Sequence, residues 1–323
     1  MEGVGKLPDA NGDSSRRPLR GPHPAARLAA APLKHTASMI PVLGGLGAAL
    51  SFAVSVLVSA RASRLIGSPS TVAGAMSVGL LLGLPVALLV APPPSIGGTT
   101  LLWLALAGFG NIVGLLLTYA AYRIGAVGIV STIASTEGSI AAILSVVAGE
   151  VLAPGAGIVL ALVAAGVALA ASVGGEEEGV AITRDRALRA AALSIGAAIC
   201  FGFSLFGAGR AAGVLPIAWA VLPARIVGVA FVALPLLALG RLRMTRAALP
   251  FVIVTGIVEV VGFWSFSLGA REGIAVASVL SSMFGPVAVV AAFVVFRERL
   301  GRRQIVGIAM IALGVAVLGV IQH

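Results

Sequence analysis

The chain of 323 residues is 59% hydrophobic and only 11% charged, so it has too little polar surface for a water-soluble globule, and we expect an integral protein of the lipid bilayer. The net charge of +10 is carried mostly by arginines between apolar runs, which indicates membrane topology and lipid headgroups rather than nucleic acid as a partner. Cys200, the single cysteine, lies in an apolar run, so we exclude a disulfide within the chain and a cysteine-ligated metal, and we predict no cofactor.

Residues 1–38 differ from the rest of the chain. They hold six Lys or Arg, five Pro and no apolar run long enough to span a membrane, which is typical of a disordered basic tail. The stretch from Ser15 to Arg20 weakly resembles a twin-arginine export signal, but a compact apolar core and a cleavage site are missing after it. Met39 lies directly before the first apolar run, so the sequence leaves open whether it is the true start.

Apolar runs of about 20 residues, the length that a helix needs to cross a bilayer, predict ten membrane spans. The predicted spans are 39–60, 70–90, 99–121, 125–149 and 153–172 in a first half, and 190–209, 215–239, 247–270, 272–296 and 301–320 in a second. The charged residues 173–189 are predicted to be a solvated linker between the halves. We therefore predict an all-α polytopic membrane bundle with repeats at 39–172 and 190–320.

The two halves repeat a short phrase 148 residues apart. The first half has Gly149-Glu150-Val151-Leu152, and the second has Arg297-Glu298-Arg299-Leu300. A duplicated bundle is the simplest explanation, and five spans in each half make the repeats inverted in the membrane. Glu150 and Glu298 fall in turns between spans, where we expect them to begin helices rather than to do chemistry.

Arginines are unevenly distributed over the predicted loops. Loops after odd-numbered spans hold thirteen, and loops after even-numbered spans hold only Arg210 and Arg271. The positive-inside rule then places the odd-numbered loops in the cytoplasm, although the basic tail argues for the opposite orientation. The orientation therefore stays open.

Three ionisable residues fall near the middle of predicted spans: Glu137, Arg225 and Glu259. Each would cost roughly 2.5 to 3.5 kcal/mol facing lipid, so we expect each to face the bundle interior. Arg225 either clips helices together by pairing with one glutamate or contacts the substrate. Because one arginine cannot neutralise two carboxylates, at least one glutamate should be protonated, bind a cation, or change protonation during a cycle. Proton coupling is therefore one hypothesis for this chain.

Hydroxyl-bearing residues surround Glu137, and Ser135 and Thr136 directly precede it. Such side chains often bond only their own backbone, but a group of them beside a buried acid indicates the wall of a wet cavity. Under the offset this stretch matches one that contains Ser281 and Ser282. There Gly285 and Pro286 predict a kinked helix, since proline removes a backbone hydrogen bond.

Asn111 and Trp264 are further candidates because of their positions relative to Glu259. Asn111 takes the position of Glu259 under the offset, so the halves carry unlike polar groups at equivalent depth. Trp264, one turn beyond Glu259, is a candidate for the cavity wall. Tyr119 and Tyr122 end the third span and are most simply interfacial anchors.

Residues from about 40 to 320 resemble the drug/metabolite transporter superfamily, in particular its EamA-like members, and the match is best in the second half. The resemblance rests on Phe284-Gly285-Pro286, on the phrase Arg297 to Leu300 followed by Gln304, Gly307 and Gly314-Val315, and on Arg225 after Leu222-Pro223. It implies a secondary carrier that works by alternating access, often an exporter of metabolites, amino acids or drugs. A small-molecule substrate and a bacterial inner membrane are expected accordingly.

Other function classes fit the sequence less well. The histidines, His23, His35 and His323, lie in the tails and no aspartate lies in a predicted span, so a serine-histidine dyad, an aspartyl pair or a histidine-ligated zinc cannot form within the bilayer. A channel would repeat polar groups along a pore, whereas here they gather near mid-depth. A structural or sensory membrane protein would not need acids there. Substrate, coupling ion, transport direction, and the choice between monomer and homodimer stay open.

Overall fold

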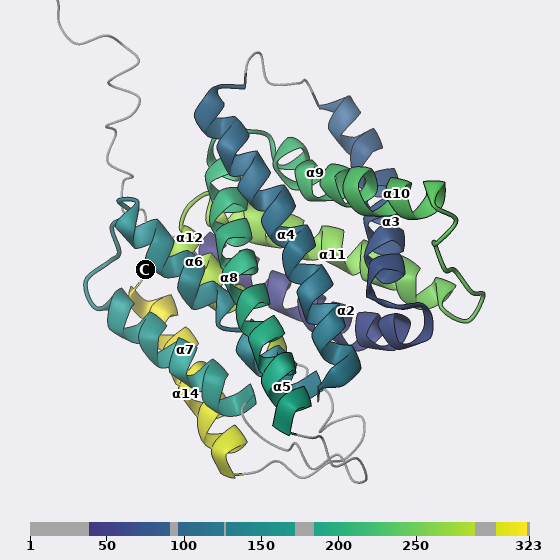
Figure 1. Ribbon diagram of the computed structural model, residues 1–323. Helices are drawn as coiled ribbons and strands as arrows, with labels where there is room; N and C mark the ends of the chain where they lie inside the picture. Colours follow the sequence, from purple (N-terminus) through teal and green to yellow (C-terminus); the bar gives the residue numbers. More distant parts are fainter. Residues whose placement is uncertain (1–38, 91–95, 126, 172–183, 288–301, 322–323) are drawn as a thin grey trace, which may run out of the picture. The chain divides into compact units, whose positions relative to one another are not determined.

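The computed structural model describes residues 39–90, 96–125, 127–171, 184–287 and 302–321. Every regular element in these ranges is a helix (Figure 1). The predicted tail 1–38, most of the linker 173–189, and the phrase around Glu298 lie outside the described residues. The prediction of an all-α membrane bundle is confirmed.

Helices of the first half follow the predicted spans. They are α2 (Ile40–Ile66), α3 (Ser68–Leu89), α4 (Gly98–Ile124), α5 (Val127–Ala134), α6 (Glu137–Val147) and α7 (Ala156–Ala171). Within the described ranges, α2, α3 and α4 are each long and apolar enough to cross a membrane. Large apolar side chains such as Leu81 and Leu89 are exposed on α3, as expected of a surface that faces lipid.

The second half repeats this order. It consists of α8 (Arg184–Val214), α9 (Ile217–Gly228), the π-helical segment η1 (Val229–Ala233), α10 (Leu234–Ala238), α11 (Leu249–Ala270), α12 (Ile274–Ser281) and α14 (Arg302–Ile321). The stretches Arg184–Val214, Ile217–Ala238 and Leu249–Ala270 are long enough to span. Both boundaries of α8 differ from the predicted span 190–209: the helix begins at Arg184, inside the predicted linker, and ends at Val214.

The helices of the two halves pack in a matching pattern. α4 runs along α8, and correspondingly α11, the counterpart of α4, runs along α2, the counterpart of α8. α7 and α14, the last described helices of each half, lie side by side (Figure 1). Glycines allow the close approaches: a methyl group on Gly110 would lie 2.7 Å from the backbone oxygen of Cys200, and one on Gly44 would lie 2.6 Å from the Cα of Gly269. Such close backbone contact is a usual source of helix association in membranes.

Two predicted spans are broken within the described residues. The predicted helix 125–149 is interrupted at Ser135 and Thr136, and the predicted helix 272–296, described as far as 287, is interrupted at Ser282 and Met283. The second break lies one turn before Pro286, whose ring crowds the carbonyl four residues earlier and cannot donate to it. The helix is thus interrupted at Ser282 and Met283, one turn before the position of the predicted kink at Gly285 and Pro286.

The side chain of Glu150 caps the start of a helix, but that helix is not the one that follows Glu150 in the chain. Its Oε1 and Oε2 accept hydrogen bonds from the backbone N–H of Ala275 at 3.1 and 3.3 Å, so the carboxylate caps the positive end of α12 in the opposite half. At the same end of the bundle, Arg210 donates to the carbonyl of Ala148, and Arg271 donates to those of Ala212 and Leu215, each at 2.8 Å. The face that holds the even-numbered loops is thus tied together by side chains.

Candidate functional site

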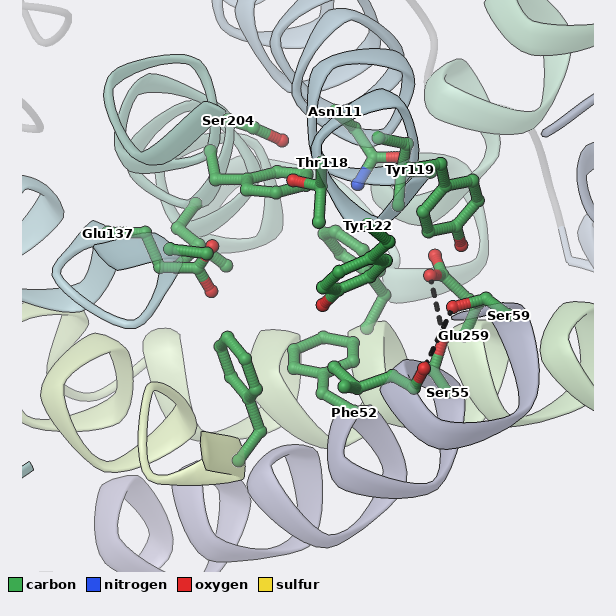
Figure 2. A pocket seen from close by; sticks show the side chains of 17 residues that line it. Phe52, Ser55, Ser59, Asn111, Thr118, Tyr119, Tyr122, Glu137, Ser204 and Glu259 are labelled. Carbon is green, nitrogen blue, oxygen red and sulfur yellow. Dashed lines mark hydrogen bonds between the residues drawn. The ribbon is translucent and has the colours of Figure 1, made fainter. Parts of the chain in front are cut away.

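A cavity with a volume of about 60 Å³ lies between the two halves. Its wall comes from α2, α4, α5, α6, α8 and α11 and from Phe284, which follows the turn after α12, so both halves build it (Figure 2). The polar lining residues are Ser55, Ser59, Asn111, Thr118, Tyr119, Tyr122, Glu137, Ser204 and Glu259, and the apolar ones are Phe52, Val56, Leu115, Ala134, Phe201, Leu205, Phe263 and Phe284. This volume holds a few water molecules and is far below the roughly 300 Å³ or more typical of organic ligand sites.

Glu259 is held on the cavity wall by two partners. Its Oε2 lies 3.6 Å from Nη1 of Arg225, and its Oε1 accepts a hydrogen bond from Ser55 at 3.1 Å (Figure 2). Both members of the ion pair are almost fully buried, with side-chain exposures of 1% for Arg225 and 5% for Glu259. Removing either partner of such a pair leaves an uncompensated buried charge, which typically costs about 3–5 kcal/mol.

Arg225 lies behind Glu259 and outside the cavity lining. Its Nη1 donates to Sδ of Met76 at 3.3 Å, and its guanidinium carbon lies 5.3 Å from the ring centre of Phe263. Gly79 makes room for it, since a methyl group there would approach Cδ of the arginine to 2.8 Å. The arginine is therefore enclosed by protein on its own side of the carboxylate, and its Nε and Nη2 have no hydrogen-bond partner within the described residues.

Glu137 has no comparable partner. It is 5% exposed, it is the first residue of α6, and its side chain lines the cavity. Among the described residues, no basic side chain lies within salt-bridge distance of its carboxylate. In the view of Figure 2, Glu137 and Glu259 lie on either side of Tyr122. The break before α6 thus places one uncompensated acid at the positive end of a helix and on the wall of the cavity.

Three polar atoms of α4 in the wall also lack partners. Oδ1 of Asn111, Oγ1 of Thr118 and the hydroxyl of Tyr119 are buried without a hydrogen bond within the described part of the chain. Ser204, by contrast, donates to the carbonyl of Ala107 at 2.9 Å. Buried polar groups are nearly always hydrogen-bonded in proteins, so Asn111 and Thr118 indicate a position for water or a ligand.

The other predicted candidates lie outside the cavity lining. Ser281 donates to the carbonyl of Ser278, and Ser282 to that of Val279. Ser135 is buried and donates to the carbonyl of Ser131. These hydroxyls bond the backbone of their own helices, which accounts for their burial without a ligand.

Thr136 and Trp264 are also placed away from the cavity. Thr136 is exposed, and its hydroxyl donates to the carbonyl of Ile133 at 2.8 Å. Trp264 is half-buried and packs against apolar clusters, while Phe263, one position earlier, lines the cavity instead. One residue is about 100° around a helix, so a neighbouring position faces a different side of the bundle.

Several lining residues were not predicted from the sequence. Tyr119 and Tyr122 are each 2% exposed and line the cavity, so their interpretation as interfacial anchors is wrong. Ser55 and Ser59 lie one helical turn apart on the same face of α2. That spacing was a usable signal, but serine pairs at this distance are common in membrane helices, where they often only bond their own backbone.

The fold and the cavity together are typical of one class of membrane protein. A polytopic bundle of two matching halves around a small polar cavity is the architecture of a membrane carrier. Within the described residues, no group of His, Cys, Asp and Glu is placed to hold a metal ion.

The chain belongs to the EamA-like transporter family, which matches residues 39–172 and again residues 188–320. The predicted superfamily and the prediction of a transporter rather than an enzyme are thereby confirmed, and the two matches support an internal repeat. No curated protein matches the chain. A crystal structure described only as that of a protein shares the fold, with 16% sequence identity, a TM-score of 0.64, and coverage of 87% of this chain and 95% of that one.

Proposed function

We propose that this transporter moves a small organic solute by alternating access and that Glu137 couples the movement to a proton. The observation that carries the proposal is the cavity between the halves, with a carboxylate in its wall that no described cation balances. A carboxylate in such a place is stabilised by binding either a proton or a cationic solute, and exchange between the two is the simplest coupling.

The cavity is too small in this conformation for an organic solute. About 60 Å³ admits a few water molecules but no metabolite. A solute would therefore bind only after the helices part, and alternating access requires such a movement. In this scheme the Glu259–Arg225 pair holds α9 and α11 together while Glu137 exchanges its ligand.

Export from the cytoplasm is the direction that we propose, in line with the family resemblance. Side chains tie the face of the even-numbered loops, where Glu150 caps α12 and Arg271 bonds two carbonyls. The cavity wall instead runs along α4 from Asn111 to Tyr122, toward the end of that helix at Ile124. That end holds the arginine-rich loops, which the positive-inside rule assigns to the cytoplasm. A bacterial inner membrane is the location that we propose.

Transport in liposomes tests the proposal. Purified protein would be reconstituted, and a panel of amino acids, amines and carboxylates would be offered with and without a proton gradient. For any solute that wild-type protein moves, we expect Glu137→Gln to lower gradient-driven transport at least about tenfold, the effect of losing roughly one charge-assisted hydrogen bond.

A matched control separates coupling from general charge effects. Glu272 lies exposed in the turn before α12, so Glu272→Gln makes the same chemical change away from the cavity and should transport like wild type. Unchanged gradient-driven transport in Glu137→Gln would contradict the proton role. Failure of wild-type protein to move any panel solute would contradict transport of this class of solute.

A further inference from the structure

The cavity wall carries acceptors and negative charge but no positive charge. Glu137 and Glu259 both contribute carboxylates, and among the described residues no lysine, arginine or histidine belongs to the lining. Arg225 is paired with Glu259 and enclosed behind it. An anionic solute would therefore find no counter-charge, and the negative charge of Glu137 would repel it.

Three further polar atoms of the wall are buried without a hydrogen-bond partner within the described residues. They are Oδ1 of Asn111, Oγ1 of Thr118 and the hydroxyl of Tyr119, and all three can accept a hydrogen bond. An amide oxygen only accepts, and a primary ammonium group supplies three N–H donors and no acceptor. Glu137, Asn111 and Thr118 together offer acceptors of the kind that an ammonium head would satisfy, with a charge-assisted hydrogen bond to the carboxylate.

Aromatic rings form much of the rest of the wall. Phe52, Phe201, Phe284 and Tyr122 all line the cavity together with Glu137. Ring faces attract cations as well as apolar groups, and an ammonium over a ring gains about 0.5–2 kcal/mol. Rings beside one uncompensated carboxylate therefore suit a cation with an apolar body.

From these observations we infer that Glu137 and its surrounding rings bind a monocationic primary amine that lacks a carboxylate. The inference rests on the proposed function, because it names the solute class for the same cavity. An amino acid would bring a carboxylate that has no basic partner in the wall, and burying such a group unpaired is costly. The inference therefore separates amines from amino acids and from carboxylates.

Three probes with the same ring test this selectivity. They are 2-phenylethylamine, phenylalanine and 3-phenylpropionate, which differ only in charged groups. Thermal unfolding of the purified full-length protein in detergent, at constant ionic strength, reports binding because a ligand of the folded state stabilises it. We expect the amine to raise the melting temperature and to bind at least about tenfold more tightly than the other two, as one unmatched charge-assisted contact implies.

Variants at the acid assign the effect to Glu137. Glu137→Gln should weaken amine binding at least about tenfold, Glu137→Asp should keep the preference for the amine, and Glu272→Gln should behave as wild type. Equal or tighter binding of phenylalanine or phenylpropionate, unchanged amine binding in Glu137→Gln, or no stabilisation by the amine would each overturn the inference.

The two proposals fail separately. If liposomes move another panel solute in a manner that depends on Glu137 while the amine does not bind, the solute class is wrong and the transporter proposal stands. If the amine binds through Glu137 but no panel solute crosses the membrane, the binding site stands and the proposed function fails.

Discussion

The two broken helices of the bundle occupy equivalent places in its halves, yet only one of the breaks is followed by a proline. In the second half the helix is interrupted at Ser282 and Met283, at the end of α12 and one turn before Pro286, whose ring accounts for the break. No proline lies in the corresponding stretch between Val127 and Val147. There the hydroxyls of Ser135 and Thr136 bond the carbonyls of Ser131 and Ile133 and so compete with the helix ladder.

The two halves share a backbone feature, the helix break, while the side chains beside it differ. Glu137 is the first residue after one break and Phe284 the first after the other, and both line the cavity. The same architectural position therefore supplies a carboxylate from one half and a ring from the other. Asymmetric side chains on a symmetric backbone give a single solute an acidic side and an apolar side.

The largest effect that we expect comes from the crossing of the two broken helices. A methyl group on Gly138, directly after Glu137, would overlap the backbone oxygen of Ser278 on α12. Backbone cannot rotate away as a side chain does, so Gly138→Ala should lower the free energy of unfolding by about 2–3 kcal/mol, in the range of overpacked cores. Unfolding in mixed micelles with increasing SDS measures this change.

Gly157→Ala is the matched control for this prediction. Gly157 lies exposed in α7, and the nearest atom to an added methyl group would be 3.8 Å away. That variant should be neutral or more stable by up to about 1 kcal/mol, as alanine favours helix over glycine. Similar losses in both variants would show that the contact between the broken helices is not special.

Most of the architecture follows from rules that act on composition and spacing. The cost of leaving backbone groups unpaired in lipid forces helices of about 20 residues, so predicted spans such as 70–90 and 247–270 lie close to α3 and α11. Only one of the two helix breaks could be expected from the sequence. Proline has a known effect on a helix, whereas Ser135 and Thr136 look like many hydroxyl residues that leave membrane helices unbroken.

The charged residues of the site could be predicted from the sequence, but the residues whose place depends on how the helices are rotated could not. Glu137 and Glu259 stand out because burying them in lipid is expensive, and the structure brings both to one cavity. Which other side chains line the cavity depends on how each helix is rotated about its axis. On α11, for example, Phe263 lines the cavity and the next residue, Trp264, does not. Tyr122 lies near the end of its span, where belts of interfacial aromatics are common, so its inward orientation carried no sequence signal.

An intermediate effect is expected from removing the cause of the second break. Pro286→Ala restores an N–H that can pair with the carbonyl of Ser282. We expect stability to rise by about 1 kcal/mol, less than the full helix penalty of proline because the break has already relieved the clash. Transport in liposomes should fall, because Phe284 would turn with the straightened helix and leave the cavity wall. Wild-type transport in Pro286→Ala would show that the second break is not needed for the cycle.

The smallest effect should come from the first break, at Thr136. Its side chain is exposed and makes one hydrogen bond to its own helix, and surface changes of this kind usually stay within about 0.5 kcal/mol. Thr136→Ala should therefore unfold and transport as wild type does, even though it directly precedes Glu137. Ser135, which is buried beside it, would then be the hydroxyl that maintains the break. A transport loss in Thr136→Ala as large as that in Glu137→Gln would instead mean that the geometry of the break, and not the charge of the acid, governs the function of this half.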